Sequence, residues 1–593
     1  MVSKLQDFGI IATFCIASIT FSLAQGSPEI CSRPAKGSVV EAPKDLRSKN
    51  GVLKTELTLR NWQDAEGIMR YCYVSNDGTI SPTLRVNPGD EVILKLRNDL
   101  KLPSGANANH AGMNGAGGCS GGLTMMMESA TNLHFHGLSI PPVCHQDETV
   151  KTLIGPSNVP FEYRFRMPRD AAPGLYWYHP HPHGQSEAQV LGGASGALIV
   201  DGIERANKLI AGLPERVIVF RDQQMPPQKA GTPVDPRRPG KDLSVNFVPV
   251  PYPDYTQAII EMKPRERQLW RVLNASADTY LDLRLLFNGS AQFMGIIGLD
   301  GMPIGFEDGR PRDKVLWQSH VALPPAGRAE FVVNGPPEGI DARLMTHAIT
   351  TGTVSNIPPV ASGAGSVSQG GAAPVAADSA VDDDNIPPRP IARIVVSAQA
   401  ADAASILPAA GTPLPGPERP PLATVKPVRE RKLYFSEELE NPKDPNSPTK
   451  FYITEEGKTP VQFNPADSPN IVVRQGDVED WVIENRSQET HAFHTHQIHF
   501  MVVGRLGIPV DEPFLRDTIN VPFWDGFTPQ YPSIKLRMDF RDPNIIGTFP
   551  YHCHVLQHED GGMMGTIRVE PASTARKTFT VPGARQLSIS ASH

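Results

Sequence analysis

One segment near the C-terminus constrains the chain most, because it places a cysteine among histidines at metal-ligand spacing. The segment reads HCHVLQHEDGGM over residues 552–563. Cysteine, two histidines and a weak axial methionine are the ligands of a blue-copper electron-transfer centre. Cys553, His558 and Met563 supply three of these ligands, and His491 is the candidate for the second histidine. An inert buried cysteine is the alternative interpretation.

The two histidines beside Cys553 point away from it if the segment is extended. Successive side chains of a strand alternate between faces. His552 and His554 therefore share one face, and Cys553 lies on the other. One short strand can then contact two metal sites and connect them through its backbone.

Three more segments carry the pattern His-x-His, which places both rings on one face of a strand. They read LHFHGL at 133–138, WYHPH at 177–181 and HAFHTH at 491–496. Because His491 lies three residues before His494, it points to the opposite face and goes with Cys553. The other histidines form one predicted cluster of eight: His134, His136, His179, His181, His494, His496, His552 and His554. Imidazole suits copper, zinc, iron and nickel alike, and the adjacent Cys/Met site favours copper.

The four motifs resemble those of the multicopper oxidase family, whose pattern HxHG, WYHxH, HxxHxH and HCHxxxHxxxxM is present here in order. The resemblance covers 70–205 and 430–572 well and 210–345 more loosely. It implies a three-domain, laccase-like protein with four copper ions per chain. It also favours the ligand pair His179 and His181 over the alternative pair His181 and His183.

The resemblance assigns each predicted ligand to one type of copper. The type 1 copper takes His491, Cys553 and His558, with Met563 as the axial ligand. The type 2 copper takes His134 and His494. The two type 3 copper ions take His136, His179, His181, His496, His552 and His554. The histidines His110, His145 and His499 are not expected to be ligands.

The resemblance also implies the reaction and its partners. A small reductant, namely a phenol, an aromatic amine or a metal ion, gives one electron at the type 1 copper. Cys553 passes the electron to His552 and His554, and four electrons reduce O2 to two waters. Laccase-like oxidation of phenols is the leading expectation, and oxidation of Fe(II) or Cu(I) is the alternative.

Reduction of O2 consumes protons, and two carboxylic acids are the candidate catalytic donors. Glu559 directly follows a predicted ligand, and Asp147 lies eleven residues after His136. The segment PPVCHQD, which ends at Asp147, is longer than in the family pattern. A solvated carboxylate is the alternative interpretation of both residues.

Two other classes of copper protein are less compatible with the motifs. A copper-containing nitrite reductase also pairs a blue site with a histidine-bound copper, but it needs far fewer histidines and two domains per chain. A non-enzymatic copper-storage or electron-carrier protein does not need a complete histidine cluster. Uptake of O2 separates that class from an oxidase.

Length and composition indicate several β-domains. A chain of 593 residues is too long for one hydrophobic core. Proline (58) and glycine (51) are abundant, charged residues make up only 20%, and runs such as 91–96 and 471–474 are typical of short strands between turns. We therefore expect an all-β fold, which by the resemblance consists of three cupredoxin-like Greek-key barrels or sandwiches.

The expected segments follow one another in a definite order. They are a signal peptide (1–24), a domain with cluster ligands (50–205), a domain without copper ligands (210–350), an Ala/Gly/Pro-rich linker or insertion with one strand near Ile391 (355–425), a domain with the type 1 copper and the other cluster ligands (430–572), and a tail (573–593). The cluster is then expected between the first and third domains, which the middle domain holds in register.

The N-terminus and the cysteines indicate a secreted or periplasmic protein. Lys4, an apolar stretch over 8–23 and small residues before Gln25 are typical of a secretory signal, with an uncleaved membrane anchor as the alternative. No later segment is expected to insert into a membrane. Four cysteines allow two disulfides in three connectivities, or remain free thiols: Cys31, Cys72, Cys119 and Cys144. A net charge of −7 without a basic run argues against a nucleic-acid partner.

Overall fold

The computed structural model describes most of the chain between residues 31 and 572. The described residues are 31–101, 118–119, 129–226, 235, 237–306, 313–352, 385–398, 400, 405–413, 419–444 and 447–572. The expected signal peptide, the tail, His110 and much of 355–425 lie outside them. Nothing in the structure therefore tests the expectations for those segments.

The first domain consists of two sheets over 45–200. One sheet has the order β3(Met69–Ser75), β2(Val52–Gln63), β5(Glu91–Asp99) and β7(Phe161–Arg166). The other has the order β1(Asp45–Arg47), β4(Thr83–Val86), β9(Gly196–Val200), β8(Gly174–His179) and β6(His134–His136). Along β5, fully buried and half-buried residues alternate, as the period of a strand with one core face requires.

The middle domain also has two sheets, which enclose a core around Trp270 and Phe331. The larger sheet runs β12(Val248–Val250), β11(Asp242–Val245), β10(Pro214–Gln223), β14(Arg267–Asn274), β21(Arg328–Asn334), β17(Met294–Leu299) and β18(Met302–Pro303), with β19(Leu316–Gln318) on β17 and β24(Ser405–Ile406) on β10. The smaller runs β13(Ala258–Met262), β23(Arg389–Val396), β22(Ala342–Thr346), β15(Leu281–Phe287) and β16(Ser290–Ala291), with β20(Val321–Leu323) on β15. The strand expected near Ile391 is β23. Its pairing with β13 and β22 makes it part of this domain's sheet rather than of a linker.

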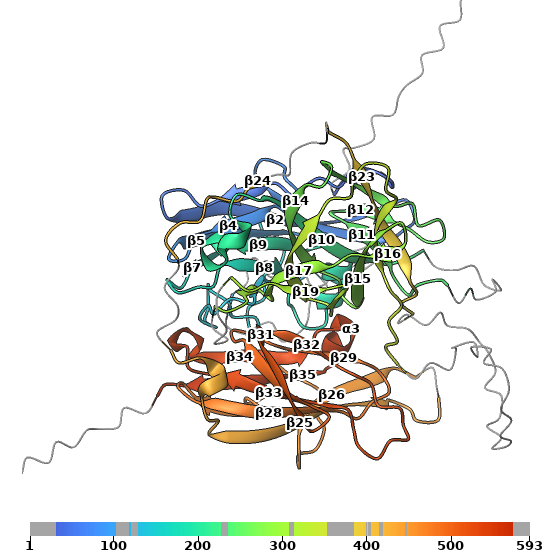
Figure 1. Ribbon diagram of the computed structural model, residues 1–593. Helices are drawn as coiled ribbons and strands as arrows, with labels where there is room; N and C mark the ends of the chain where they lie inside the picture. The colour runs from blue at the N-terminus through green and yellow to red at the C-terminus, as the bar shows by residue number, and fades with distance from the viewer. Residues whose placement is uncertain are drawn as a thin grey trace, which may run out of the picture.

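The third domain carries the last two histidine motifs. One sheet runs β26(Thr449–Glu455), β25(Arg429–Leu439), β28(Val478–Asn485), β33(Ser533–Asp539), β30(Phe500–Arg505) and β31(Ile508–Arg516). The other runs β27(Ile471–Arg474), β35(Met564–Glu570), β34(Gly547–Cys553), β29(His491–Thr495) and β32(Thr518–Val521). In Figure 1 this domain, orange to red, lies below the first and middle domains, and α3(Leu556–Asp560) lies on its upper side.

The predicted all-β class is confirmed. The described residues form six sheets in three pairs, and their α-helices are short: α1(Ser186–Leu191), α2(Ile203–Ala206) and α3. The 3-10 helices are η2(Lys208–Ile210), η3(Leu422–Thr424) and η4(Pro543–Ile545). No helix in the described part of the chain is long and apolar enough to span a membrane.

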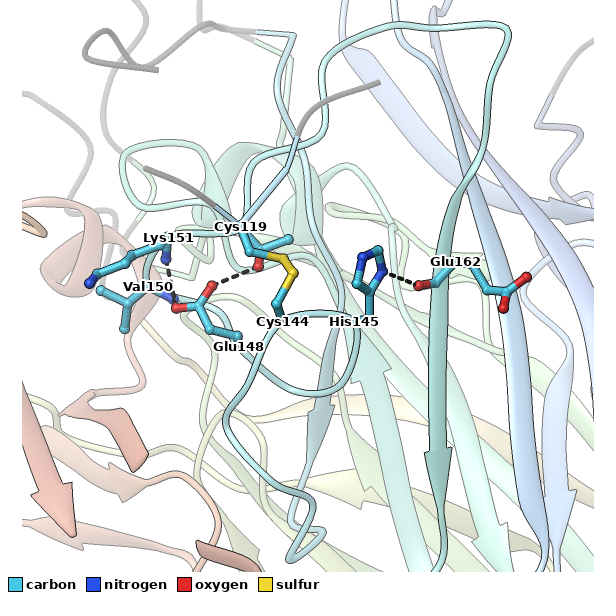
Figure 2. Close-up of a disulfide and its surroundings, with 8 residues drawn as sticks. Cys119, Cys144, His145, Glu148, Val150, Lys151 and Glu162 are labelled. Atoms are coloured by element: carbon cyan, nitrogen blue, oxygen red, sulfur yellow. Dashed lines mark hydrogen bonds between the residues drawn. A yellow bond between two sulfur atoms is a disulfide. The ribbon is translucent and has the colours of Figure 1, made fainter. Parts of the chain in front are cut away.

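Two disulfides resolve the connectivity that the sequence left open. Cys31 is bonded to Cys72, and Cys119 to Cys144. Figure 2 shows the second disulfide beside His145 and Glu148. His145 donates to the backbone oxygen of Glu162. The Glu148 carboxylate accepts from the backbone N–H groups of Val150 and Lys151. These bonds fix the loop that leads into Asp147.

Candidate metal centres

The cysteine site is assembled from three elements of the third domain. His491 begins β29, Cys553 ends β34 and His558 lies in α3. The Sγ atom of Cys553 lies 3.6 Å from Nδ1 of His491 and 3.8 Å from Nδ1 of His558, and the two nitrogens are 3.1 Å apart. One sulfur and two imidazole nitrogens therefore converge in a buried space.

Met563 reaches this site through a tight turn. The Cys553 N–H donates to the Met563 oxygen at 3.1 Å, and the Met563 N–H donates to the His558 oxygen at 2.9 Å. The Met563 side chain is fully buried in the same core cluster as Cys553. The turn thus brings all four predicted type 1 residues together.

The site favours the thiolate that a metal needs. Burial alone would raise the pKa of Cys553, but hydrogen bonds with His491 and His558 lower that pKa to about 6. The thiolate rather than the thiol is the metal-binding form.

The outer nitrogens of both imidazoles contact polar groups that the sequence motifs did not reveal. Nε2 of His491 lies 2.6 Å from the Ser487 hydroxyl and 3.0 Å from the Glu437 carboxylate. Nε2 of His558 lies 3.2 Å from the Glu489 carboxylate. Such partners orient a ligand ring and raise its basicity. Glu489 is close to His491 in the sequence, whereas Glu437 comes from β25 and has no local signal.

The histidine cluster lies between the first and third domains. In β6 and β8, His134 is paired with His179, and in β29 and β34, His494 is paired with His552. Phe493 is paired with Cys553 in the same register, so these two side chains lie on the same face of the sheet. His491 comes two residues before Phe493 and therefore lies on that face as well. This register agrees with the strand parity expected from the sequence.

All eight histidines of the predicted cluster are buried, and their rings contact one another. His134 stacks on His496 at 3.8 Å between ring centroids, and His136 stacks on His494 at 4.0 Å. Nε2 of His552 lies 3.2 Å from Nε2 of His181 and 3.3 Å from Nε2 of His496. The His554 ring lies between 5.2 and 5.6 Å from the rings of His136, His494 and His179.

Unpaired ring nitrogens show that the cluster fits metal ions. Buried nitrogens without a hydrogen-bond partner occur on six rings: His134 Nε2, His136 Nδ1, His179 Nε2, His494 Nε2, His496 Nδ1 and both nitrogens of His554. Burial, followed by repulsion among the rings, lowers the pKa of these histidines, as for His134 and His496. A buried neutral imidazole without a partner is costly, and a metal ion satisfies it.

Several outer nitrogens are bonded to backbone oxygens, which fixes the tautomer. Nδ1–H of His179 donates to Pro180, that of His494 to Asp517 and that of His552 to Cys553, at 2.8 to 3.0 Å. In each case the protonated nitrogen points outward, so Nε2 is the unprotonated nitrogen that can bind a metal.

Asp147 binds the outer nitrogen of His134, and its carboxylate is buried rather than solvated. The carboxylate accepts from Nδ1–H of His134 at 3.0 Å, from the Phe135 N–H at 2.9 Å and from Nε2 of Gln497 at 2.6 Å. Asp147 is only 1% exposed, and burial raises its pKa.

Glu559 is also buried and lies near the cluster. Its Oε1 accepts from the Ser186 hydroxyl at 3.4 Å and lies 3.7 Å from Nδ1 of His181. Its Oε2 is buried without a hydrogen-bond partner. Burial raises the pKa of Glu559 well above its usual value, with a further contribution from Asp560.

The other histidines make different contacts. His145 is exposed on its loop, His499 donates to the Asp300 oxygen at 2.9 Å, and the His183 ring packs edge-on against Phe463. The His179 ring, in contrast, lies 5.3 Å from His134, inside the cluster. This geometry corresponds to the ligand pair His179 and His181.

Asp517 is the principal cluster neighbour that the sequence motifs missed. Its carboxylate accepts from Nε2–H of His136 at 3.2 Å and from both terminal nitrogens of Arg328. Burial acts to raise the pKa of Asp517, but Arg328 lowers it by more. No motif contains Asp517, and its role depends on contacts between domains.

The paired sheets and the buried Cys/His sites define a cupredoxin-like metalloprotein, and comparisons identify the family. Profiles described as "Multicopper oxidase" match residues 123–205 and 442–573. A multicopper oxidase of Staphylococcus epidermidis is 23% identical over 555 residues, which cover 90% of this chain and 91% of the relative. A laccase of Haloferax volcanii is 33% identical over 113 residues, 18% of each chain.

A solved structure shares the fold. The multicopper oxidase of Campylobacter jejuni, described as a metallo-oxidase, superposes with a TM-score of 0.61 at 21% identity and covers 91% of this chain and 96% of its own. The cupredoxin-like fold expected from the sequence is confirmed. The chain belongs to the multicopper oxidase family. It is an oxidoreductase that uses O2, and its family implies copper as the cofactor.

Proposed function

We propose that the protein is a laccase-like oxidase that couples one-electron oxidation of a small phenolic reductant to four-electron reduction of O2 to water. One observation carries the proposal. A buried Cys/His/Met site and a buried cluster of eight histidines are joined at the end of β34, where Cys553 belongs to one site and its neighbours His552 and His554 belong to the other.

Four copper ions per chain are proposed, as the family pattern implies. His491, Cys553, His558 and Met563 would hold the type 1 copper, and His134 and His494 the type 2 copper. The type 3 pair would be held by His136, His179, His181, His496, His552 and His554. When bound, copper supplies the one-electron oxidation and the reduction of O2 at these sites.

The protein contributes fixed ligand geometry, exclusion of water and a covalent connection between the sites. The cluster histidines are at most 2% exposed, so bulk water is kept from their rings. Cys553 is bonded through the backbone directly to His552 and His554, which gives the shortest covalent route between the two ligand sets.

Glu559 and Asp147 are proposed as the acids that serve the cluster. Glu559 contacts His181 and Ser186 and has a free oxygen, so it is positioned to transfer a proton. Asp147 holds Nδ1–H of His134 and connects it through Gln497 to the third domain. Replacing Glu559 by Gln should slow O2 reduction while the copper content stays unchanged.

The reductant is proposed to bind next to His558, at a small cavity that Asp278, Glu489 and Thr490 also line. Glu489 contacts the outer nitrogen of His558 and is partly exposed. A carboxylate in this place can accept the proton that a phenol loses together with its electron.

Oxidation of a metal ion is the second candidate, and the same carboxylates favour it. Asp278 has one buried oxygen without a hydrogen-bond partner, and Glu489 lines the same cavity. Two carboxylates beside His558 would also suit a cationic substrate such as Fe(II), whereas Cu(I) favours softer sulfur ligands.

Steady-state assays of the copper-loaded protein with a phenol, Fe(II) and Cu(I) side by side test the proposal, with O2 uptake as the common readout. Phenol oxidation with the highest kcat/KM supports the laccase-like function, and a higher value for a metal ion supports the alternative. If the Glu489→Gln variant loses phenol turnover at high pH and at low pH alike, Glu489 has a role in binding the phenol rather than in accepting its proton. Absence of O2 uptake with all three reductants would contradict both candidates.

Secretion or periplasmic location is proposed together with cleavage of residues 1–24. Two disulfides support an oxidising compartment, because such bonds persist there and are rare in the cytosol. The proposed domain limits are 50–205, 210–350 and 430–572, and β23 extends the middle domain beyond them.

A further inference from the structure

Asp517 contacts two rings of the histidine cluster from outside. Its carboxylate accepts from Nε2–H of His136 at 3.2 Å, and its backbone oxygen accepts from Nδ1–H of His494 at 2.8 Å. His136 and His494 are stacked on each other at 4.0 Å. On both rings the remaining nitrogen is buried without a hydrogen-bond partner. One residue between β31 and β32 therefore fixes which nitrogen of each ring is free.

The middle domain holds Asp517 in place. Arg328, the first residue of β21, donates from its two terminal nitrogens to the two carboxylate oxygens at 2.8 and 2.5 Å. Asp300, from the same domain, accepts from the backbone N–H groups of Arg328, Asp517 and Thr518. Arg328 and Asp517 are both fully buried. A two-point contact of this kind fixes orientation as well as charge.

Gly137, the glycine of the HxHG motif in the first domain, leaves space for the Arg328–Asp517 pair because it has no side chain. A Cβ atom on Gly137 would lie 2.6 Å from a terminal nitrogen of Arg328 and 2.8 Å from a carboxylate oxygen of Asp517. Gly137 directly follows His136 and has a φ of +88°. All three domains therefore meet at one buried ion pair beside the cluster.

We propose that Arg328 and Asp517 are positioning residues for the copper cluster, through which the middle domain orients His136 and His494. The middle domain holds no proposed copper ligand, yet it determines the geometry of two of them. This inference rests on the proposed copper cluster. It adds that two residues outside the ligand motifs are needed to position the ligands.

The test measures copper retention rather than activity alone. Arg328→Met should leave the absorption of the Cys553 site intact and weaken retention of the cluster copper against a chelator by about 10- to 100-fold, the usual effect of losing an outer partner of a ligand. The electron paramagnetic resonance signal of the type 2 copper should change with it. Arg328→Lys, which keeps the charge but not the two-point contact, should fall between wild type and Arg328→Met.

Arg271→Met is the matched control. Arg271 is also a fully buried arginine of the middle domain, and its carboxylate partners are Glu215 and Glu330 rather than Asp517. The Arg271→Met variant should have a lower melting temperature than wild type but should retain the cluster copper as tightly. If Arg328→Met fails to fold, Arg328→Met/Asp517→Leu removes both charges, so no unpaired buried charge remains.

Three outcomes are distinguishable. Weakened cluster copper in the Arg328 variants but not in Arg271→Met supports the inference. Wild-type retention and an unchanged resonance signal in Arg328→Met, or in the double variant where that is the folded form, would overturn it. Wild-type protein that binds no cluster copper would instead contradict the proposed function on which the inference rests.

Discussion

At the scale of single residues, the outer hydrogen-bond partner of each imidazole decides which nitrogen faces inward. Asp147 holds Nδ1 of His134, and Asp517 holds Nε2 of His136, so neighbouring residues of one motif present different nitrogens. The sequence motif predicts that both rings share a face, but it does not contain this difference. The carboxylates that produce it come from a loop and from another domain.

Met563→Leu should raise the reduction potential of the proposed type 1 copper while the protein stays blue. The physical reason is that a weak axial donor, which stabilises Cu(II), is lost. Redox titration of the two proteins measures the difference. An unchanged or lower potential would mean that Met563 is not the axial ligand, and Met564 would be the residue to replace next.

Gly137→Ala should destabilise the fold by about 1–3 kcal/mol, because the added Cβ meets the Arg328–Asp517 pair at a positive φ. Gly78→Ala is the control, since Gly78 has a φ of +81° and a Cβ added there would have no other atom within 4 Å. Denaturant unfolding of the two variants separates crowding from backbone strain. Equal losses of unfolding free energy would show that crowding at Gly137 is unimportant.

At the scale of elements, β29 and β34 are adjacent strands that each carry residues of both sites. Their register pairs His494 with His552 and Phe493 with Cys553. Strand parity was enough to predict this division from the sequence, because the alternation of faces has a period of two. It could not predict Glu437 or Arg328, which reach the sites from β25 and β21 through tertiary packing.

Two substitutions in β29 test the division between the sites. His494→Ala should spare the blue absorption and block O2 reduction, and His491→Ala should remove the blue absorption while the cluster keeps its copper. Visible absorption and the electron paramagnetic resonance of the type 2 copper measure the two sites separately. Damage to the same copper in both variants would contradict the assignment.

At the scale of the whole molecule, buried ion pairs join the middle domain to its neighbours. Glu215 of β10 is bonded to Arg85 of the first domain and to Arg271 of β14. The all-β class could be predicted from the sequence, because strand runs and turn residues are local signals, and the expectation of three domains came from the family resemblance. Which charged residues are buried between domains is not a local property, so these pairs could not be predicted in the same way.

Stability should fall in acid as Glu215 becomes protonated. Burial raises the pKa of Glu215, but Arg271 and Arg85 lower it by more, from the ordinary value of 4.5 to about 2. Because the folded-state pKa is the lower one, the stabilisation is complete above about pH 4.5 and is lost as the pH falls toward 2. The shift corresponds to about 3 kcal/mol.

Glu215→Gln measures this contribution. The variant should be less stable than wild type at pH 7 by about 3–5 kcal/mol, since an arginine pair is left without its carboxylate. Melting curves between pH 7 and 3 should show the difference shrinking as the pH falls below about 4.5. A difference that stays constant over this range would exclude Glu215 as the titrating group.

Cys553 is proposed to belong to one copper site and to link it to the cluster that reduces O2. The most direct measurement is visible absorption and O2 uptake, with a reductant present, of the copper-loaded wild type and Cys553→Ser. We expect the wild type to be blue and to consume O2, and the variant to lose both properties while its histidine cluster retains copper. A Cys553→Ser protein that stays blue, or that consumes O2 at the wild-type rate, would contradict the account.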